Sequence, residues 1–414
     1  MYDVEAVRAD FPILSREVDG HPLVYLDTAS SAQKPRAVIE AIAETYENEY
    51  ANVHRGLHYL SSLATERYES TREIVARFLG AASEEEIIFT SGATDAINLV
   101  SYAWAAPRLR EGDEIVLSAL EHHANIVPWH FLRERQGVRL RWVDLGEGGT
   151  LDPGAVLDAI GPRTRLVAVS HMSNVLGGLV DVAAICRGAA ERGVPVLVDG
   201  SQTAAHTSVD VAAIGCDFYA ITGHKLYGPS GSGALYARRE RMAETRPFRG
   251  GGDMIRDVTR EGVVYAGLPL RFEAGTPAIV PQIGLGVALR YLTRLGMEQV
   301  AAHERGLRAH ARRRLSGIEG VSVWGADDSG PILSFEIAGL DARKIAVELD
   351  RLGIATRAGS FCSRPLLRTL GVGALCRASF GLYTTQAEVE LFCDAVRDLA
   401  RAAVAREALP GGSV

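Results

Sequence analysis

At 414 residues, the chain is longer than one average domain and can bury several apolar cores, so we expect two or three domains. Its 47% hydrophobic and 23% charged residues exclude a disordered or fibrous protein. The formal net charge is -7, which argues against nucleic acid as a partner, because phosphate backbones attract basic surfaces.

The first ten residues are partly acidic and contain no apolar stretch, so we expect no secretory signal. No apolar run approaches the ~20 residues that span a bilayer, and we therefore expect a cytoplasmic protein without a membrane partner. The five cysteines lack CxxC spacing, which argues against a zinc knuckle or a disulfide framework.

Between residues 85 and 222, short apolar runs alternate with helical patterns. This alternation predicts a parallel sheet that helices cover on both faces. Ligands of such sheets gather at the carboxyl ends of the strands. The predicted strands are residues 86–90, 114–118, 140–143, 165–170, 194–199 and 218–222.

After about residue 285, the pattern indicates a smaller α+β domain. A long helical pattern covers residues 283–317, and its basic stretch Arg308 to Arg314 is predicted to be the solvated face of a helix that begins near Met297. A further helix is predicted over 341–353, followed by a C-terminal helix. The predicted strands are residues 321–324, 332–337, 354–357 and 377–382.

A strand, a glycine turn and a helix are predicted from Ile87 to Asn98, IIFTSGATDAIN. The backbone amides from Ser91 to Thr94, including Ala93, would face an anion at the start of that helix. The alternative is an ordinary helix cap, since Ser and Thr are common there.

His123 follows another predicted strand, in the segment SALEHHAN. Its flat imidazole could stack on a cofactor ring and move protons above it. The neighbouring His122 and His130 raise a metal site as the alternative, but no carboxylate lies at a helical ligand spacing, and we expect no metal.

Lys225 lies at the end of a predicted strand, among turn-forming residues in ITGHKLYGPSGSG. A partly desolvated lysine loses its charge more easily and can then form a Schiff base. Thr222 and His224 of the same segment could bind a phosphate. The alternatives are a phosphate-binding or surface lysine, although a Walker loop is disfavoured because there the glycines precede the lysine.

Asp199 ends the predicted strand that is followed by Gly200, Ser201 and Gln202. A carboxylate at this position can pair with a protonated pyridine nitrogen, which turns the ring into an electron sink. It could equally bind magnesium or cap the next helix.

Cys362 lies in RAGSFCSRP, with arginines on both sides that would stabilise a nucleophilic thiolate. A structural cysteine is the alternative. Arg377, in CRASFGLY, is suited to clamp an amino-acid carboxylate with two hydrogen bonds, although a surface arginine would fit as well.

An ordered series of segments resembles the Suf-type (group II) cysteine desulfurases and selenocysteine lyases of the class V aminotransferase fold. The resemblance covers nearly the whole chain, which makes it far more specific than any single motif. The segments are YLDTAS, ANVHRGLHYLS, SGATDAINLV, EHHANIVPW, HMSNVLGG, VDGSQTAAH, ITGHKLYGPSG, GGDMI, FEAGTP and RASFGLY.

The resemblance implies a pyridoxal-phosphate (PLP)-dependent transferase of fold type I, an α/β protein whose large domain has a mainly parallel seven-stranded sheet. Residues 31–285 would form this large PLP-binding domain. Residues 286–414 would form the small α+β domain that carries the nucleophilic cysteine loop. Residues 1–30 would be an N-terminal segment associated with the small domain.

The resemblance also implies a reaction, in which L-cysteine becomes L-alanine and its sulfur passes to Cys362 as a persulfide. A protein or small-molecule acceptor would then take the sulfur, for iron–sulfur cluster assembly or another pathway. Thr276 would reach the cofactor phosphate of a neighbouring subunit, so a homodimer is expected. The remaining implied roles are Lys225 for the Schiff base, Asp199 and Gln202 at the ring, His123 stacked on it, Ala93, Thr94, Thr222 and His224 at the phosphate, and Asn174, Arg357 and Arg377 at the substrate.

The cysteine loop departs from the family pattern. The family has two histidines before the cysteine and alanine and methionine after it, whereas this chain has Ser360, Phe361, Ser363 and Arg364. Asp95 also stands where a glutamate is common. A selenocysteine lyase or C–S lyase of the same fold, an aminotransferase and a non-catalytic sulfur-transfer scaffold are the rival functions.

Overall fold

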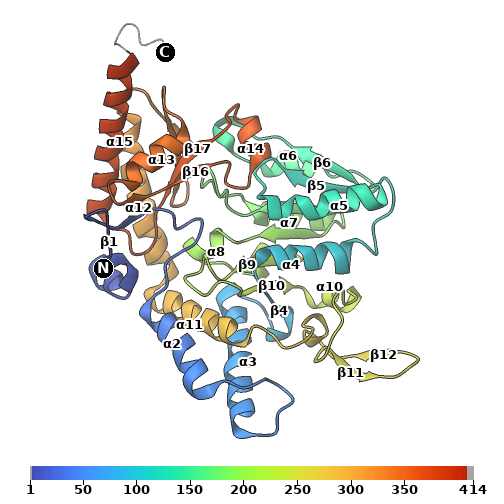
Figure 1. Cartoon of the computed structure of the whole chain (residues 1–414). Helices are drawn as coiled ribbons and strands as arrows, with labels where there is room; N and C mark the ends of the chain where they lie inside the picture. Colours follow the sequence, from blue (N-terminus) through green and yellow to red (C-terminus); the bar gives the residue numbers. More distant parts are fainter. Residues whose placement is uncertain (1, 408–414) are drawn as a thin grey trace.

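A computed structural model describes residues 2–407 of the chain. Its main element is a seven-stranded sheet in the order β4-β10-β9-β8-β7-β5-β6, in which β10 is antiparallel to both neighbours and β5 to β9 are parallel (Figure 1). The strands are β4 (Ile87–Thr90), β5 (Glu114–Ser118), β6 (Arg139–Val143), β7 (Thr164–Ser170), β8 (Val196–Asp199), β9 (Phe218–Thr222) and β10 (Gly233–Ala237).

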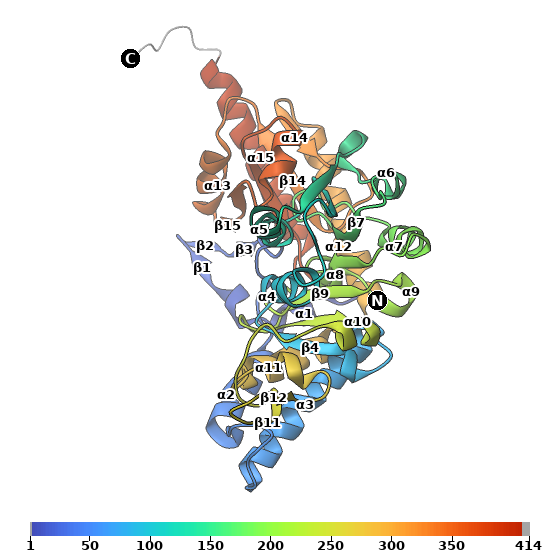
Figure 2. The same cartoon turned by 90° about the vertical axis from the view of Figure 1, so that its right-hand side faces the viewer.

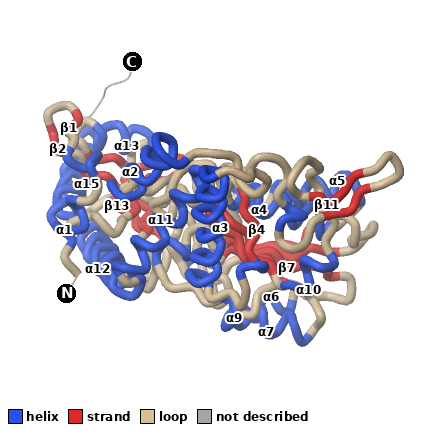
Figure 3. Tube along the Cα trace, turned by 90° about the horizontal axis from the view of Figure 1, so that it is seen from below, coloured by secondary structure: helices blue, strands red, loops and turns tan. Residues whose placement is uncertain are grey.

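Both faces of this sheet are buried, because alternate strand residues enter two different apolar cores. In β7, Leu166 and Ala168 pack in the core under α4 (Ala93–Leu99) and α5 (Val127–Gln136). Val167 and Val169 pack in the opposite core. That core also contains residues of α3 (Tyr59–Leu79), α7 (Val182–Glu191) and α11 (Ile279–Leu295), and Figure 3 shows α3 and α11 side by side.

A second, four-stranded antiparallel sheet has the order β13-β14-β17-β16. Residues of α12 (Met297–Ser316), α13 (Ala342–Asp350) and α15 (Gln386–Glu407) cover it, and Figure 2 shows this layer above the large sheet. Near it, β3 (Val24–Tyr25) pairs in parallel with β15 (Ile354–Ala355). The strands are β13 (Val321–Trp324), β14 (Ile332–Ile337), β16 (Arg357–Gly359) and β17 (Leu375–Ser379).

The six strands predicted up to residue 222 are confirmed. The helical pattern over 283–317 is two helices, α11 and α12, with Gly296 between them at a φ of 82°; α12 begins at Met297, as predicted for the helix that carries the basic stretch. Two other predictions are wrong. The run 354–357 is divided between β15 and β16, which belong to different sheets. Arg308 is not solvated, because it is 1% exposed and donates to the carbonyl oxygens of Ala326 and Asp327.

Among the described residues, no helix has both the length and the apolar character needed to cross a membrane. The predicted domain limits stay predictions, and the boundary at residue 285 falls within α11.

A buried ion pair joins α3 to the segment that follows β12 (Val263–Tyr265). Arg72, only 2% exposed, donates to both carboxylate oxygens of Glu273 at 2.6 and 3.0 Å. Glu273 also accepts from the backbone nitrogen of Phe89 at 2.8 Å. The pair therefore ties the helix and the segment before Thr276 to β4.

Breaking this pair should destabilise the protein more than breaking an exposed pair on the same helix. In Arg72→Ala, the Glu273 carboxylate stays buried without its partner, so we expect the free energy of unfolding to fall by about 3 kcal/mol. Arg77→Ala removes the Arg77–Glu73 pair, whose side chains are 75% and 59% exposed, and should cost less than about 1 kcal/mol. Denaturant unfolding followed by circular dichroism measures both losses, and equal losses would contradict the expectation.

Candidate active site

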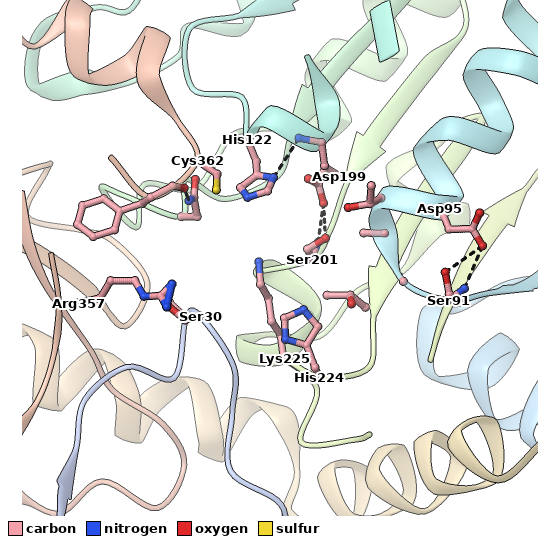
Figure 4. Close-up of a pocket in the computed structure, with 18 of the residues that line it drawn as sticks. Ser30, Ser91, Asp95, His122, Asp199, Ser201, His224, Lys225, Arg357 and Cys362 are labelled. Carbon is pink, nitrogen blue, oxygen red and sulfur yellow. Dashed lines mark hydrogen bonds between the residues drawn. The ribbon is translucent and has the colours of Figure 1, made fainter. Parts of the chain in front are cut away.

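A pocket of about 340 Å³ opens where the parallel strands end. The turns after β4, β5, β8 and β9 supply one side of its lining, and the N-terminal segment and the small sheet supply the other. In Figure 4, Cys362 and Lys225 point into the same space from opposite sides, and His122 lies beside Cys362. The lining residues discussed below are Ser30, Gly92, Ala93, Thr94, His122, Asn174, Asp199, Ser201, Thr222, His224, Lys225, Arg357, Phe361, Cys362 and Arg377.

Lys225 presents its amine to the pocket three residues after β9. Removal from water lowers the pKa of this lysine to about 8, while the nearby Asp199 carboxylate acts in the opposite direction. A larger fraction of this amine than of an exposed lysine is therefore uncharged near neutral pH, and the uncharged form can act as a nucleophile.

Asp199 and Gln202 each have a side-chain oxygen without a hydrogen-bond partner among the described residues. Asp199 accepts two hydrogen bonds from Ser201, at 3.0 and 2.5 Å, and both end on Oδ1. Gln202 Nε2 donates to the carbonyl oxygen of Ala29 at 2.9 Å, and its buried Oε1 has no hydrogen-bond partner among the described residues. Such atoms fit a polar ligand, because buried polar groups normally have partners.

The turn between β4 and α4 approaches β10 so closely that it requires glycine. Gly92 has a φ of 146°, and a Cβ atom there would lie 3.1 Å from Thr222 Oγ1. A Cβ atom at Gly233 would lie 2.6 Å from Gly92 Cα. The residues that follow, Ala93 and Thr94, line the same pocket as Thr222 and His224.

The histidine that lines the pocket is His122, and the prediction for His123 needs correction. His122 accepts from the backbone nitrogen of Ala124 at 3.1 Å, and burial, together with the Lys225 cation, lowers its pKa to about 4. His123 is not among the pocket-lining residues. The turn that begins after β5 directs it to the cysteine loop, where its backbone nitrogen donates to the Cys362 carbonyl oxygen at 2.7 Å.

Arg377 is buried at the rim of the pocket, with a 2% exposed side chain. It donates to the carbonyl oxygen of Asn174 and to Ser30 Oγ, each at 2.6 Å, and contacts Asp27 at 3.3 Å. Burial lowers its pKa to about 10, so it stays a cation at neutral pH. Arg357 pairs with the same Asp27 carboxylate at 3.4 Å from the exposed side.

Cys362 is exposed and lies in a loop whose backbone is fixed at several atoms. Phe361 and Cys362 have φ angles of 52° and 55°, a conformation that costs of order 1–3 kcal/mol for each non-glycine residue. Asn174 Nδ2 donates to the Phe361 carbonyl oxygen at 2.7 Å, and Asn174 Oδ1 accepts from Ser363 Oγ at 3.0 Å. His123 Nε2 accepts from the Arg364 backbone nitrogen at 3.2 Å. These contacts hold the strained loop with its thiol at the pocket.

Comparisons with known proteins agree with this geometry. A family model for class-V aminotransferases matches residues 24–392. The chain belongs to this class V aminotransferase family. It is 48% identical to a probable cysteine desulfurase of Xylella fastidiosa, over 95% of each chain, and 46% identical to a cysteine desulfurase of Pectobacterium atrosepticum, over 94% of this chain and 96% of the relative.

The fold of this class V aminotransferase is also similar to solved structures of cysteine desulfurases. The cysteine desulfurase CsdA of Escherichia coli has a TM-score of 0.90 at 38% identity and covers 97% of this chain and 99% of its own. The cysteine desulfurase of Thermococcus onnurineus has a TM-score of 0.92 at 36% identity, with 96% and 98% covered. The predicted fold class is thereby confirmed.

Most of the predicted site residues of this class V aminotransferase converge on the pocket, and three do not. Besides His123, the exceptions are Gln202, which is not among the lining residues, and Thr276, which lines a separate hollow together with Ser91 and Asp95. Sequence reasoning missed the pocket roles of His122 and Ser30. His122 lies four residues after the end of β5, one residue nearer to the strand than His123. This position relative to the strand end was the signal in the sequence that could have identified it.

The reactivity of Lys225 should change near pH 8. An unprotonated amine is the reactive form, so labelling of Lys225 by an amine reagent in the cofactor-free enzyme should rise as the pH passes through about 8. In Asp199→Asn the carboxylate that raises this pKa is lost, so the midpoint should move to lower pH. Site-resolved mass spectrometry separates Lys225 from Lys34 and Lys344, and an upward shift in the variant would contradict the assignment.

Proposed function

We propose that the chain is a PLP-dependent cysteine desulfurase, which converts L-cysteine to L-alanine and transfers the sulfur to Cys362 as a persulfide. The observation that carries this proposal is that an exposed thiol, a lysine with a lowered pKa and a buried arginine line one pocket. The relatives named cysteine desulfurases support the same reaction.

The residues of the pocket fit PLP. The close approach of Gly92 and Gly233 leaves a cradle for such a group. Gln202 directly follows the lining residue Ser201, and its buried Oε1, which has no partner among the described residues, would provide a polar contact. We propose that Lys225 carries PLP, that Asp199 pairs with its ring nitrogen and that His122, in place of His123, stacks on the ring. Ala93, Thr94, Thr222 and His224 would bind the phosphate. When bound, PLP withdraws electrons from the substrate α-carbon.

Arg377 is the proposed clamp for the cysteine carboxylate. Its guanidinium has five N–H donors, and its buried Nε has no partner among the described residues. A bidentate contact would fix the carboxylate, and hence the direction of the substrate thiol. Asn174 and the more exposed Arg357 flank this position and complete the proposed substrate site.

Cys362 is the proposed sulfur acceptor. Its thiolate attacks the substrate sulfur, so that an S–S bond forms while the C–S bond breaks. The electron pair of the C–S bond stays with the carbon fragment, which becomes alanine after proton addition. Lys225 and His122 are the proton carriers, because their pKa values of about 8 and about 4 leave both with an uncharged fraction at neutral pH.

We also propose that the enzyme is a cytoplasmic homodimer in which Thr276 reaches the phosphate site of the partner. Thr276 lines a hollow that shares Ser91 with the main pocket, which fits a contact with a second copy. Leu57 and Tyr59, just before and at the start of α3, are exposed apolar residues that a second copy would cover. Free thiols fit a reducing compartment. Light scattering, which measures the mass of the particle in solution, tests the dimer. We further propose that a protein or a small molecule accepts the sulfur from Cys362.

Cys362→Ala should abolish alanine formation from L-cysteine, because no thiolate remains to take the sulfur. The variant should still bind PLP, which its absorbance reports. Cys186→Ala, at a buried cysteine of α7, is the matched control and should keep its activity. Alanine and sulfide are measured for cysteine and selenocysteine. Undiminished turnover of cysteine by Cys362→Ala would show a C–S lyase that does not need this thiol.

The two adjacent histidines should differ in their effect on turnover. His122→Ala removes a group over the pocket and should lower kcat by roughly 10²-fold or more. His123→Ala leaves the pocket lining intact and should have a much smaller effect on kcat. Steady-state kinetics with cysteine decide between them, and the reverse order would restore the role first predicted for His123.

A further inference from the structure

Phe361 joins the cysteine loop to the buried arginine. Its ring is 9% exposed, and the guanidinium carbon of Arg377 lies 4.7 Å from the ring centroid. The next residue is Cys362, whose thiol is exposed. The side chain that precedes the nucleophile therefore packs on the proposed carboxylate clamp.

The Arg377 guanidinium makes two kinds of contact: hydrogen bonds from its N–H groups and a contact with an aromatic ring. Ser30, Asp27 and the Asn174 carbonyl oxygen accept hydrogen bonds from its N–H groups. Donors of a planar guanidinium point outward in its plane, whereas its weakly hydrated face suits an aromatic ring. The guanidinium carbon lies over the Phe361 ring, 4.7 Å from its centroid, so the ring can restrict the tilt that the hydrogen bonds leave free.

Asn174 makes a second connection between the same two groups. Its side chain binds the backbone of Phe361 and the hydroxyl of Ser363, while its carbonyl oxygen accepts from Arg377. The φ angles of 52° and 55° at Phe361 and Cys362 need such support, because side chains other than glycine rarely adopt them. The loop and the arginine are thus held as one unit.

We propose that Phe361 is a positioning residue, whose stacking on Arg377 couples binding of the substrate carboxylate to placement of the Cys362 thiol. The inference rests on the proposed desulfurase function. A substrate held by a correctly tilted Arg377 would meet the thiol at a defined place. Loss of the ring face would loosen both groups together, so that binding and sulfur transfer suffer at once.

The test compares Phe361→Leu with Phe361→Tyr in the PLP-loaded enzyme. Leucine keeps an apolar side chain without a ring face, so we expect KM for cysteine to rise about 5- to 20-fold and kcat to fall. Tyrosine keeps the ring face and should stay within about twofold of the wild type. Hydrogen exchange of the backbone amides of residues 360–364 should become several-fold faster in Phe361→Leu, a readout independent of turnover.

Phe131→Leu is the matched control, because it removes a similar pair with Arg135, at 4.9 Å, on helix α5. It should change neither the kinetics nor the exchange of the loop. Should Phe361→Leu fail to fold, trifluorophenylalanine at position 361 keeps the shape of the ring and weakens its electrostatic face; KM should then rise at an unchanged Tm.

The proposal would be overturned if Phe361→Leu, or the fluorinated protein, had the same KM and the same hydrogen exchange in residues 360–364 as the wild type. Equal impairment of Phe361→Tyr and Phe361→Leu at an unchanged Tm would also overturn it. The desulfurase function is tested by a different result: undiminished turnover of cysteine by Cys362→Ala would contradict the proposed function, whatever the Phe361 variants show.

Discussion

The buried cation of Arg377 is the constraint on which the site depends. A guanidinium withdrawn from water must be surrounded by partners, since an unpaired buried charge is strongly destabilising. Here the partners come from distant parts of the chain: Asp27 and Ser30 near the N-terminus, Asn174 after β7, and Phe361 beside the nucleophile. The hydrogen bonds and the aromatic contact of this one cation therefore connect the large sheet, the small sheet and the N-terminal segment beside the pocket.

The electrostatic character of the pocket follows from the same burial. Lys225, His122 and His224 each have a lowered pKa, to about 8, about 4 and about 4, with burial as the main cause. Neighbouring cations lower the two histidine values further. Two uncharged imidazoles, and an amine that loses its proton near pH 8, therefore face a site that also holds a carboxylate and an exposed thiol, which favours proton and sulfur transfer.

Side-chain register was hard to predict at the end of β5. His122 and His123 are adjacent, and both follow the same strand, so residue type and spacing do not separate them. The turn decides, because it sends His122 over the pocket and His123 to the backbone of Cys362. Residue type also did not reveal the burial of Arg308. The basic stretch has the pattern of a solvated helix face, but in the fold Arg308 donates to the carbonyl oxygens of Ala326 and Asp327.

The sequence by itself determined the alternating strands and helices up to β9 and the residue types at the strand ends, including Asp199 and Lys225. These features depend on local periodicity and turn chemistry, which neighbouring residues carry. Only the tertiary structure decided that β10 inserts between β4 and β9, and that Cys362 faces Lys225. Those outcomes depend on contacts between residues far apart in the chain, whose free energy no local pattern encodes.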